Sequence, residues 1–252
     1  MSIIIHGRAE IEAMRRAGRC AAATLAMVGE RIRPGVSAAD IDRWVREDTA
    51  RRGARPSQLG FKGFPAAVCV SPNEVVCHGI PRADRVLREG DIVNVDVTSE
   101  LEGFHGDCSY TFVLGDVPPR VRALVDTTKH CRDEVIAAAR PGVRLGELGE
   151  LCEQLAAEAG FRVVGEFGGH GIGRQMHMFP HVPHVGPANR GVRLRAGMTI
   201  TIEPILTLGK PGIRLLDDGW TVVTRDGSPS AQFEHTILVT EDGAEPLTAG
   251  LM

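Results

Sequence analysis

The chain has 252 residues, of which 43% are hydrophobic and 24% charged, so its composition is that of a folded globular protein and excludes a disordered one. Its 29 lysines and arginines nearly balance 32 aspartates and glutamates, which excludes a general attraction to nucleic acid or anionic lipid. No apolar run is long enough for a membrane span, and charged residues interrupt the segment where a signal peptide would lie, so we expect a cytoplasmic protein.

Each half of the chain begins with two predicted helices. A helix with one apolar face over 11–32 is followed by Arg-Pro-Gly-Val at 33–36 and a second helix that ends near Gly53. The same order, with the same Arg-Pro-Gly-Val sequence, returns 107 residues later over 121–135 and 140–160. A shared offset across helices and turns indicates an internal repeat.

Two predicted strands follow the first helix pair. Residues 92–98 and 107–113 have strand-like alternation, and we expect a hairpin whose two-residue turn is Leu101-Glu102. In this register Asp96 lies directly opposite Asp107 on one face of the hairpin. Two buried carboxylates at that separation repel each other unless a proton or cation lies between them, so the pair predicts a metal site. The alternative is an exposed hairpin face on which both aspartates are solvated.

The second half repeats the strand pattern and adds two more acids. Leu-Arg-Glu-Gly at 87–90 precedes the first strand, and Leu-Arg-Ala-Gly at 194–197 precedes an equivalent strand that ends at Glu203. A later acid, Glu234, lies in a similar apolar, strand-forming segment. Glu203 and Glu234 would lie opposite each other if their segments paired around a turn at Asp218-Gly219. Three intervening prolines, however, exclude one uninterrupted hairpin.

The repeat predicts the architecture. Matches at one offset in helix, turn and strand indicate an α+β fold in which two structurally equivalent halves join their sheets, with helices covering one face. We place the halves at about 8–114 and 115–239, within a single domain over 1–252.

Histidine is the expected nitrogen donor for a metal, and His170 is the candidate because it lies among the glycines of 168–173. A histidine that is only hydrogen-bonded is the alternative. The six cysteines contain no C-x-x-C pair, and neither a phosphate-binding loop, a complete dinucleotide fingerprint nor H-E-x-x-H occurs. One histidine with four carboxylates is an oxygen-rich set that suits two divalent ions, such as Mn, Fe(II), Co or Zn, and hydrolysis.

Six ordered motifs resemble the type I methionine aminopeptidases, from about Arg8 to Val239. They are N-E-V-V-C-H-G-I-P at 73–81, N-V-D at 94–96, H-G-D at 105–107, G-H-G-I-G at 169–173, T-I-E-P at 201–204 and Q-F-E-H at 232–235. The resemblance implies the pseudo-two-fold pita-bread fold, with a central antiparallel-rich sheet and helices on its outer face.

The resemblance also implies the site residues. The implied ligands of a dinuclear centre are Asp96, Asp107, His170, Glu203 and Glu234, with Asp107 and Glu234 bridging the ions. His78 and His177 are the implied catalytic, substrate-contacting histidines, and Glu203 also shuttles a proton. The implied methionine pocket comprises Phe61, Phe64, Cys69, Met176 and Trp220. Taken alone, His78 fits a turn histidine, His177 a loop histidine and the pocket residues ordinary core.

The implied activity is removal of the initiator methionine from nascent proteins whose second residue is small. A metal-bound hydroxide would attack the first peptide bond, and the metal identity stays open. The implied partner is the N-terminal methionine of nascent polypeptides, with transient ribosome contact, no membrane and no specific nucleic acid. We expect a monomer without the N-terminal extension of some relatives.

The sequence departs from the family pattern at three positions. Gln58 and Lys62 stand where many relatives have cysteine and histidine, and Met178 follows His177 where glutamate is usual. These departures put the pocket shape and the surroundings of His177 in question.

Two other functions compete with this one. An Xaa-Pro aminopeptidase shares the fold but adds a large N-terminal domain, and a catalytically silent pita-bread protein would act as a ribosome- or nucleic-acid-associated binding module.

Overall fold

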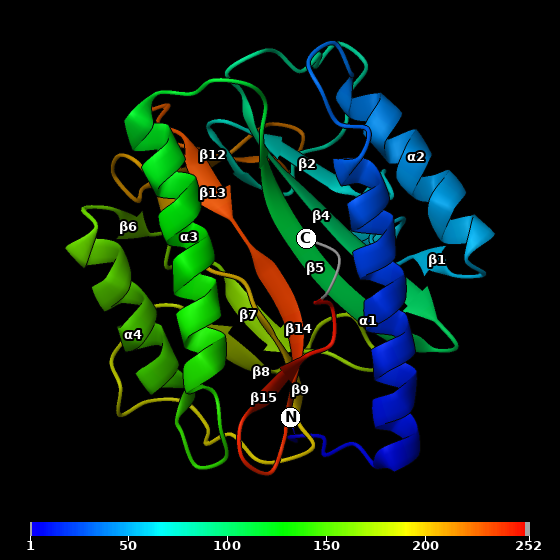
Figure 1. The fold of residues 1–252 in the computed structure, drawn as a ribbon, viewed down its shortest axis with the longest axis vertical. Coiled ribbons are helices and arrows are strands. Elements are labelled where there is room, and N and C mark those ends of the chain that lie inside the picture. Colours follow the sequence, from blue (N-terminus) through cyan, green and yellow to red (C-terminus); the bar gives the residue numbers. More distant parts are fainter. Residues whose placement is uncertain (1, 250–252) are drawn as a thin grey trace.

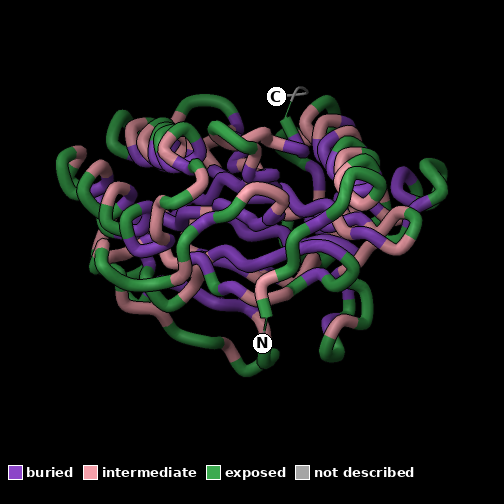
Figure 2. Tube along the Cα trace, turned by 90° about the horizontal axis from the view of Figure 1, so that it is seen from below, coloured by how far each residue is buried: buried purple, intermediate pink, exposed green. Residues whose placement is uncertain are grey.

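The computed structural model describes residues 2–249 and places helices on one side of a curved antiparallel sheet (Figure 1). Viewed at right angles, the strands form a buried layer beneath the helices, and exposed loops surround it (Figure 2). The α-helices are α1 (Arg8–Gly29), α2 (Ala38–Arg51), α3 (Pro119–Ala138) and α4 (Leu145–Glu158), and a short 3₁₀ helix covers Phe61–Gly63.

The described residues form fifteen β-strands. They are β1 (Arg55–Pro56), β2 (Cys69–Pro72), β3 (Val75–Cys77), β4 (Ile92–Leu101), β5 (Phe104–Val113), β6 (Arg162–Val163), β7 (Gly168–Gly171), β8 (Met178–Pro183), β9 (Thr199–Ile202), β10 (Ile205–Thr207), β11 (Ile213–Leu215), β12 (Val222–Thr224), β13 (Ser230–Gln232), β14 (Glu234–Val239) and β15 (Ala244–Pro246). The main sheet runs β1-β4-β5-β14-β9-β7-β8, with β2 on β4 and β15 on β14.

Two hydrophobic cores attach the helices to this sheet. Apolar residues of α1 and α2, including Leu25 and Ile41, pack with Val93, Val95 and Val97 of β4. A second cluster joins α3 and α4 to the strands of the second half. Because strand residues alternate between faces, the side chains between these valines point away from the helices.

The 107-residue offset recurs in the backbone pairing. Helices α2 and α4 begin and end at equivalent residues, since 38 and 51 become 145 and 158. Arg55 pairs with Glu100, and the residues 107 positions later, Arg162 and Thr207, pair in the same way. The two halves meet where β5 pairs with β14. The boundary that we place between the halves, near residue 114, stays a prediction.

The predicted register of the first hairpin is wrong by two residues. Its turn is Glu102-Gly103, with φ of 53° and 77°, so Thr98 and not Asp96 lies opposite Asp107. A turn at Leu101-Glu102 would need a positive φ at Leu101, whereas glycine adopts that conformation without strain. A shift by two leaves every side chain on its original face, so Asp96 and Asp107 remain diagonal neighbours there.

The segments that contain Glu203 and Glu234 pair in one register, but this pairing is divided into three separate ladders. Ile202 pairs with His235, Ile205 with Gln232 and Ile213 with Thr224, all centred on Asp218-Gly219. The interruptions coincide with the prolines, which lack the N–H that a continuous ladder requires. Glu203 and Glu234 lie at opposing positions of this register, between two of the ladders.

Gly106 allows α1 to lie directly on β5. A Cβ at this position would come within 2.5 Å of the Ala17 carbonyl and the Gly18 nitrogen. We therefore expect Gly106→Ala to lower the free energy of unfolding by about 1–3 kcal/mol through overpacking. Urea unfolding of the variant measures this effect. Gly243→Ala, where a Cβ meets nothing within 4 Å, is the matched control, and equal stability of the two variants would contradict the prediction.

Candidate metal centre

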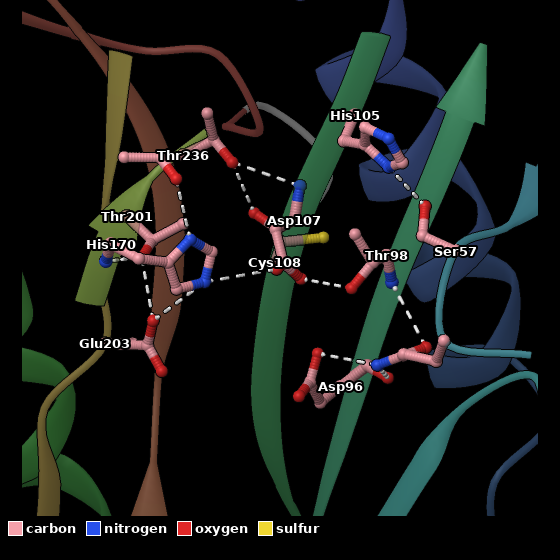
Figure 3. A network of polar contacts seen from close by, with 12 residues as sticks. Ser57, Asp96, Thr98, His105, Asp107, Cys108, His170, Thr201, Glu203 and Thr236 are labelled. Carbon is pink, nitrogen blue, oxygen red and sulfur yellow. Dashed lines mark hydrogen bonds and ion pairs between the residues drawn. The ribbon is translucent and has the colours of Figure 1, made fainter. Parts of the chain in front are cut away.

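The candidate ligands come from neighbouring strands of the main sheet. Asp96 lies on β4, Asp107 on β5, His170 on β7 and Glu234 on β14, and Glu203 directly follows β9. Figure 3 shows Asp107, His170 and Glu203 directed toward a common space, with Asp96 on the adjacent strand. All five residues line one cavity of about 920 Å³. The sheet therefore brings together acids that are up to 138 residues apart in the chain, such as Asp96 and Glu234.

Three of these residues form a tight cluster. Asp107, His170 and Glu234 each offer one ligand atom, and these atoms lie within 4.8 Å of one another. The Nε2 of His170 is 3.8 Å from Asp107 Oδ2 and 3.6 Å from Glu203 Oε1. Atoms at these separations can surround a metal ion. Asp96 and Glu203 border the cluster without belonging to that closest set.

The carboxyl groups of the site are buried close to one another, and their pKa values rise. Burial raises the pKa of Asp107 to about 6 and that of Glu203 to about 8. The pKa values of Asp96 and Glu234 lie well above the usual range, first because of burial and then because of the charge on Asp107. The pKa values rise because the negative charges of these acids are not balanced. A bound cation would balance them and lower the pKa values again. The donor set therefore fits divalent metal ions.

His170 has its ring nitrogen available for a metal. Its Nδ1 lies 3.0 Å from the Gly171 carbonyl oxygen, which can only accept, so Nδ1 carries the proton and donates it there. The lone pair of Nε2 then faces the carboxylates. Burial lowers the pKa of His170 to about 3, so the imidazole is neutral, as a metal ligand must be.

Further polar side chains hold the acids in place. Thr98 Oγ1 donates to Asp107 Oδ1 at 2.7 Å, and Thr201 Oγ1 donates to Glu203 Oε1 at 2.7 Å. Gln232 Nε2 donates to Glu203 Oε2 at 3.3 Å, and the Glu203 N–H donates to Nε2 of buried His184 at 3.1 Å. We did not predict a role for the two threonines or Gln232 from the sequence. Each of the three lies two residues along the chain from a candidate ligand, and this spacing was an available signal because it keeps strand residues on one face.

Both candidate catalytic histidines line the same cavity. The ring of His177 lies 4.1 Å from that of His170 and 5.1 Å from that of Phe61. The ring of His78 packs edge-on against Phe167 and Trp220. Desolvation lowers the pKa of His177 to about 4, with smaller contributions from His78 and Lys62, and burial lowers the pKa of His78.

The candidate pocket residues lie beside the metal cluster. Phe64 and Cys69 form a small apolar cluster with partly buried Trp220, whose ring meets that of Phe64 edge-on at 5.1 Å. Phe61 and buried Met176 complete the predicted set, and all five line the cavity. The three departures from the family pattern, Gln58, Lys62 and Met178, line it too. Lys62 holds its ammonium 5.3 Å from the centre of the Phe61 ring.

In the described part of the chain no helix has the length and apolar character needed to cross a membrane.

Comparisons with known proteins identify the family. The sequence matches metallopeptidase family M24 over residues 12–241. It is 47% identical to methionine aminopeptidase A of Synechocystis sp., over 99% of this chain and 98% of that protein. It is 44% identical to the methionine aminopeptidase of Escherichia coli K12, over 98% and 94% of the two chains.

A solved structure agrees with the sequence matches. The methionine aminopeptidase of Thermotoga maritima superposes with a TM-score of 0.97 at 40% identity, over 99% of this chain and 100% of that one. The likeness confirms the predicted α+β pita-bread fold. The chain therefore belongs to metallopeptidase family M24 and, within it, to the type I methionine aminopeptidases.

Proposed function

We propose that this chain removes the N-terminal methionine from polypeptides whose second residue is small, in a reaction that requires divalent metal ions. One observation carries the proposal: ligand atoms of Asp107, His170 and Glu234 converge within 4.8 Å in a cavity that His78 and His177 also line. The names of the relatives support the choice of methionine as the residue removed.

We assign two divalent ions, Co, Mn, Fe(II) or Zn, to the five acid and imidazole side chains. Asp107, His170 and Glu234, whose ligand atoms lie within 4.8 Å of one another, would hold the ions together with Asp96 and Glu203. Buried carboxylates with raised pKa values support this assignment because cations would stabilise their charge. When bound, such ions polarise a carbonyl and lower the pKa of water toward neutrality.

The protein side chains orient the substrate and move its protons. His177, neutral because its pKa is lowered to about 4, would donate an N–H to the oxygen of the scissile carbonyl as negative charge develops there. His78 would contact the scissile amide. Glu203, whose carboxylate lies 3.6 Å from His170 Nε2 in the same cluster, would take up a proton and pass it to the leaving amine.

The apolar wall formed by Phe61, Phe64, Cys69, Met176 and Trp220 would receive the methionine side chain. A flexible, polarizable thioether packs well against aromatic rings and sulfur. A nascent polypeptide as substrate, transient ribosome contact, a monomeric state and a cytoplasmic location stay predictions.

The direct test uses the metal-stripped protein with Co(II), Mn(II), Fe(II) or Zn(II) and the peptides Met-Ala-Ser and Ala-Pro-Ser. We expect metal-dependent release of methionine alone, read by mass spectrometry. Absence of release with every metal would contradict the proposed function and favour the binding-module alternative. Release of alanine from Ala-Pro-Ser would favour an Xaa-Pro aminopeptidase.

Replacement of His177 separates its role from metal binding. We expect His177→Ala to keep its metal content while turnover of Met-Ala-Ser falls by roughly 10²–10³, the usual effect of removing one oxyanion donor. Metal analysis and steady-state kinetics on the same sample measure both quantities. His130→Ala, on the exposed surface of α3, is the control and should retain both. A variant of His177 that loses its metal would identify this residue as a ligand instead.

Removal of the metals makes stability depend on pH. A buried acid whose pKa is raised by folding binds more protons in the folded state, so stability falls as pH rises toward the folded pKa. For Glu203 this window extends from its unfolded value of 4.5 to about 8. Above pH 7 the buried histidines, whose pKa values are lowered on folding, are largely neutral in both states and contribute little.

We therefore expect the free energy of unfolding of the chelated protein to fall by about 1 kcal/mol or more between pH 7 and pH 8. Mn(II) should raise Tm more at pH 8 than at pH 7, because ligation favours the ionised acids. Urea unfolding and thermal melts measure the two effects. Glu203→Gln should flatten the dependence, and a chelated protein that is equally stable at both pH values would contradict the assignment.

A further inference from the structure

The edge of β4 is incompletely paired next to Asp96. The ladder with β2 ends where Cys69 pairs with Asp96, and the ladder with β1 begins where Pro56 pairs with Ser99. Between these two ladders the chain leaves β1 and crosses the edge of β4 at Gln58. The gap outside both ladders comprises Val97 and Thr98 and begins directly after Asp96, one of the candidate metal ligands. Within it the Ser57 N–H donates to the Thr98 carbonyl at 2.9 Å.

The carboxamide of Gln58 fills this gap as a peptide group of a partner strand would. Its Nε2 donates to the backbone carbonyl of Asp96 at 2.9 Å, and its Oε1 accepts from the N–H of Thr98 at 3.5 Å. A donor and an acceptor held in one plane reproduce the pattern of a strand neighbour. Gln58 as a whole is 7% exposed, so these bonds are shielded from water.

The same amide also reaches the side chain of Asp96. Gln58 Nε2 lies 3.2 Å from Asp96 Oδ1, and its two hydrogens can serve the carbonyl and the carboxylate together. Thr98 supports Asp107, and Thr201 and Gln232 support Glu203, in a comparable way. Among the described side chains, Gln58 is the one that donates a hydrogen bond to the Asp96 carboxylate.

We propose that Gln58 is a positioning residue that fixes the Asp96 carboxylate for metal binding, an inference that rests on the proposed function. Asp96 is surrounded by other acids that repel its charge. An amide anchored to the backbone of the same residue holds the carboxylate at one orientation against that repulsion. A shorter side chain such as cysteine could not bridge Asp96 and Thr98, so this arrangement depends on the glutamine.

The test compares Mn(II) binding by calorimetry to the metal-stripped, full-length protein and two variants. Gln58→Met keeps the length of the side chain and removes its donor and acceptor. Gln175→Met is the matched control, because Gln175 lines the same cavity and its side chain makes no hydrogen bond to Asp96 among the described residues. We expect Gln58→Met to weaken Mn(II) binding by about 10- to 100-fold, as is usual for loss of a residue that orients a ligand. Gln175→Met should bind within about twofold of the wild type, well short of that loss.

The Co(II) absorption spectrum provides a second readout, because its visible bands report the geometry of the ligands. We expect these bands to shift in Gln58→Met and not in Gln175→Met. A role of Gln58 only in shaping the methionine pocket would raise KM for Met-Ala-Ser while leaving Mn(II) affinity and the Co(II) spectrum unchanged, and this result would overturn the proposal.

A second variant at residue 58 and the wild-type protein serve as further controls. If circular dichroism shows that Gln58→Met does not fold, Gln58→Cys removes the same hydrogen bonds with a shorter side chain, and the same loss of Mn(II) affinity is expected. Wild-type protein that binds no Mn(II) would overturn the proposed metal centre and this inference with it. Wild-type binding with unchanged affinity in the Gln58 variants would overturn this inference alone.

Discussion

The repulsion among four carboxyl groups, two of them buried and two partly buried, is the constraint on which the rest of this structure depends. Asp96, Asp107, Glu203 and Glu234 each lose hydration, and each raises the cost of ionising its neighbours. Such an arrangement persists only if the rest of the molecule holds it rigidly and if a counter-charge is available. The fold supplies the rigidity and leaves a cavity in which the counter-charge fits.

The rigidity comes from a sheet whose helix-facing side is apolar. Val93, Val95 and Val97 bury one face of β4 under α1 and α2, which fixes the direction of the residues between them. Gly106 brings α1 against the strand that carries Asp107. Since β5 pairs with β14, ligands from both halves of the chain share one continuous hydrogen-bonded surface. Stability of the core and geometry of the site are therefore coupled.

Polar neighbours then set the orientation of each ligand. Hydroxyl and amide donors such as Thr98, Thr201 and Gln58 reach the acids, and the Gly171 carbonyl sets the tautomer of His170. Low pKa values keep His170 and His177 uncharged at neutral pH, so these imidazoles do not satisfy the carboxylates by themselves. The negative charge of the carboxylates is therefore not balanced by the protein, and the site favours binding of cations. A metal-dependent hydrolase requires this property.

The sequence by itself determined the repeat, the strand character of the segments around the acids and the face on which those acids lie. These features depend on local periodicity and on turn residues, which adjacent positions encode. The predicted register of the first hairpin was wrong by two residues because the turn requires positive φ values, which Glu102 and Gly103 adopt, and not Leu101. Only the tertiary structure decided that Asp107, His170 and Glu234 converge and that Gln58 completes the edge of β4. Such contacts depend on how distant strands pair, and no local pattern specifies the orientation of a side chain across that distance.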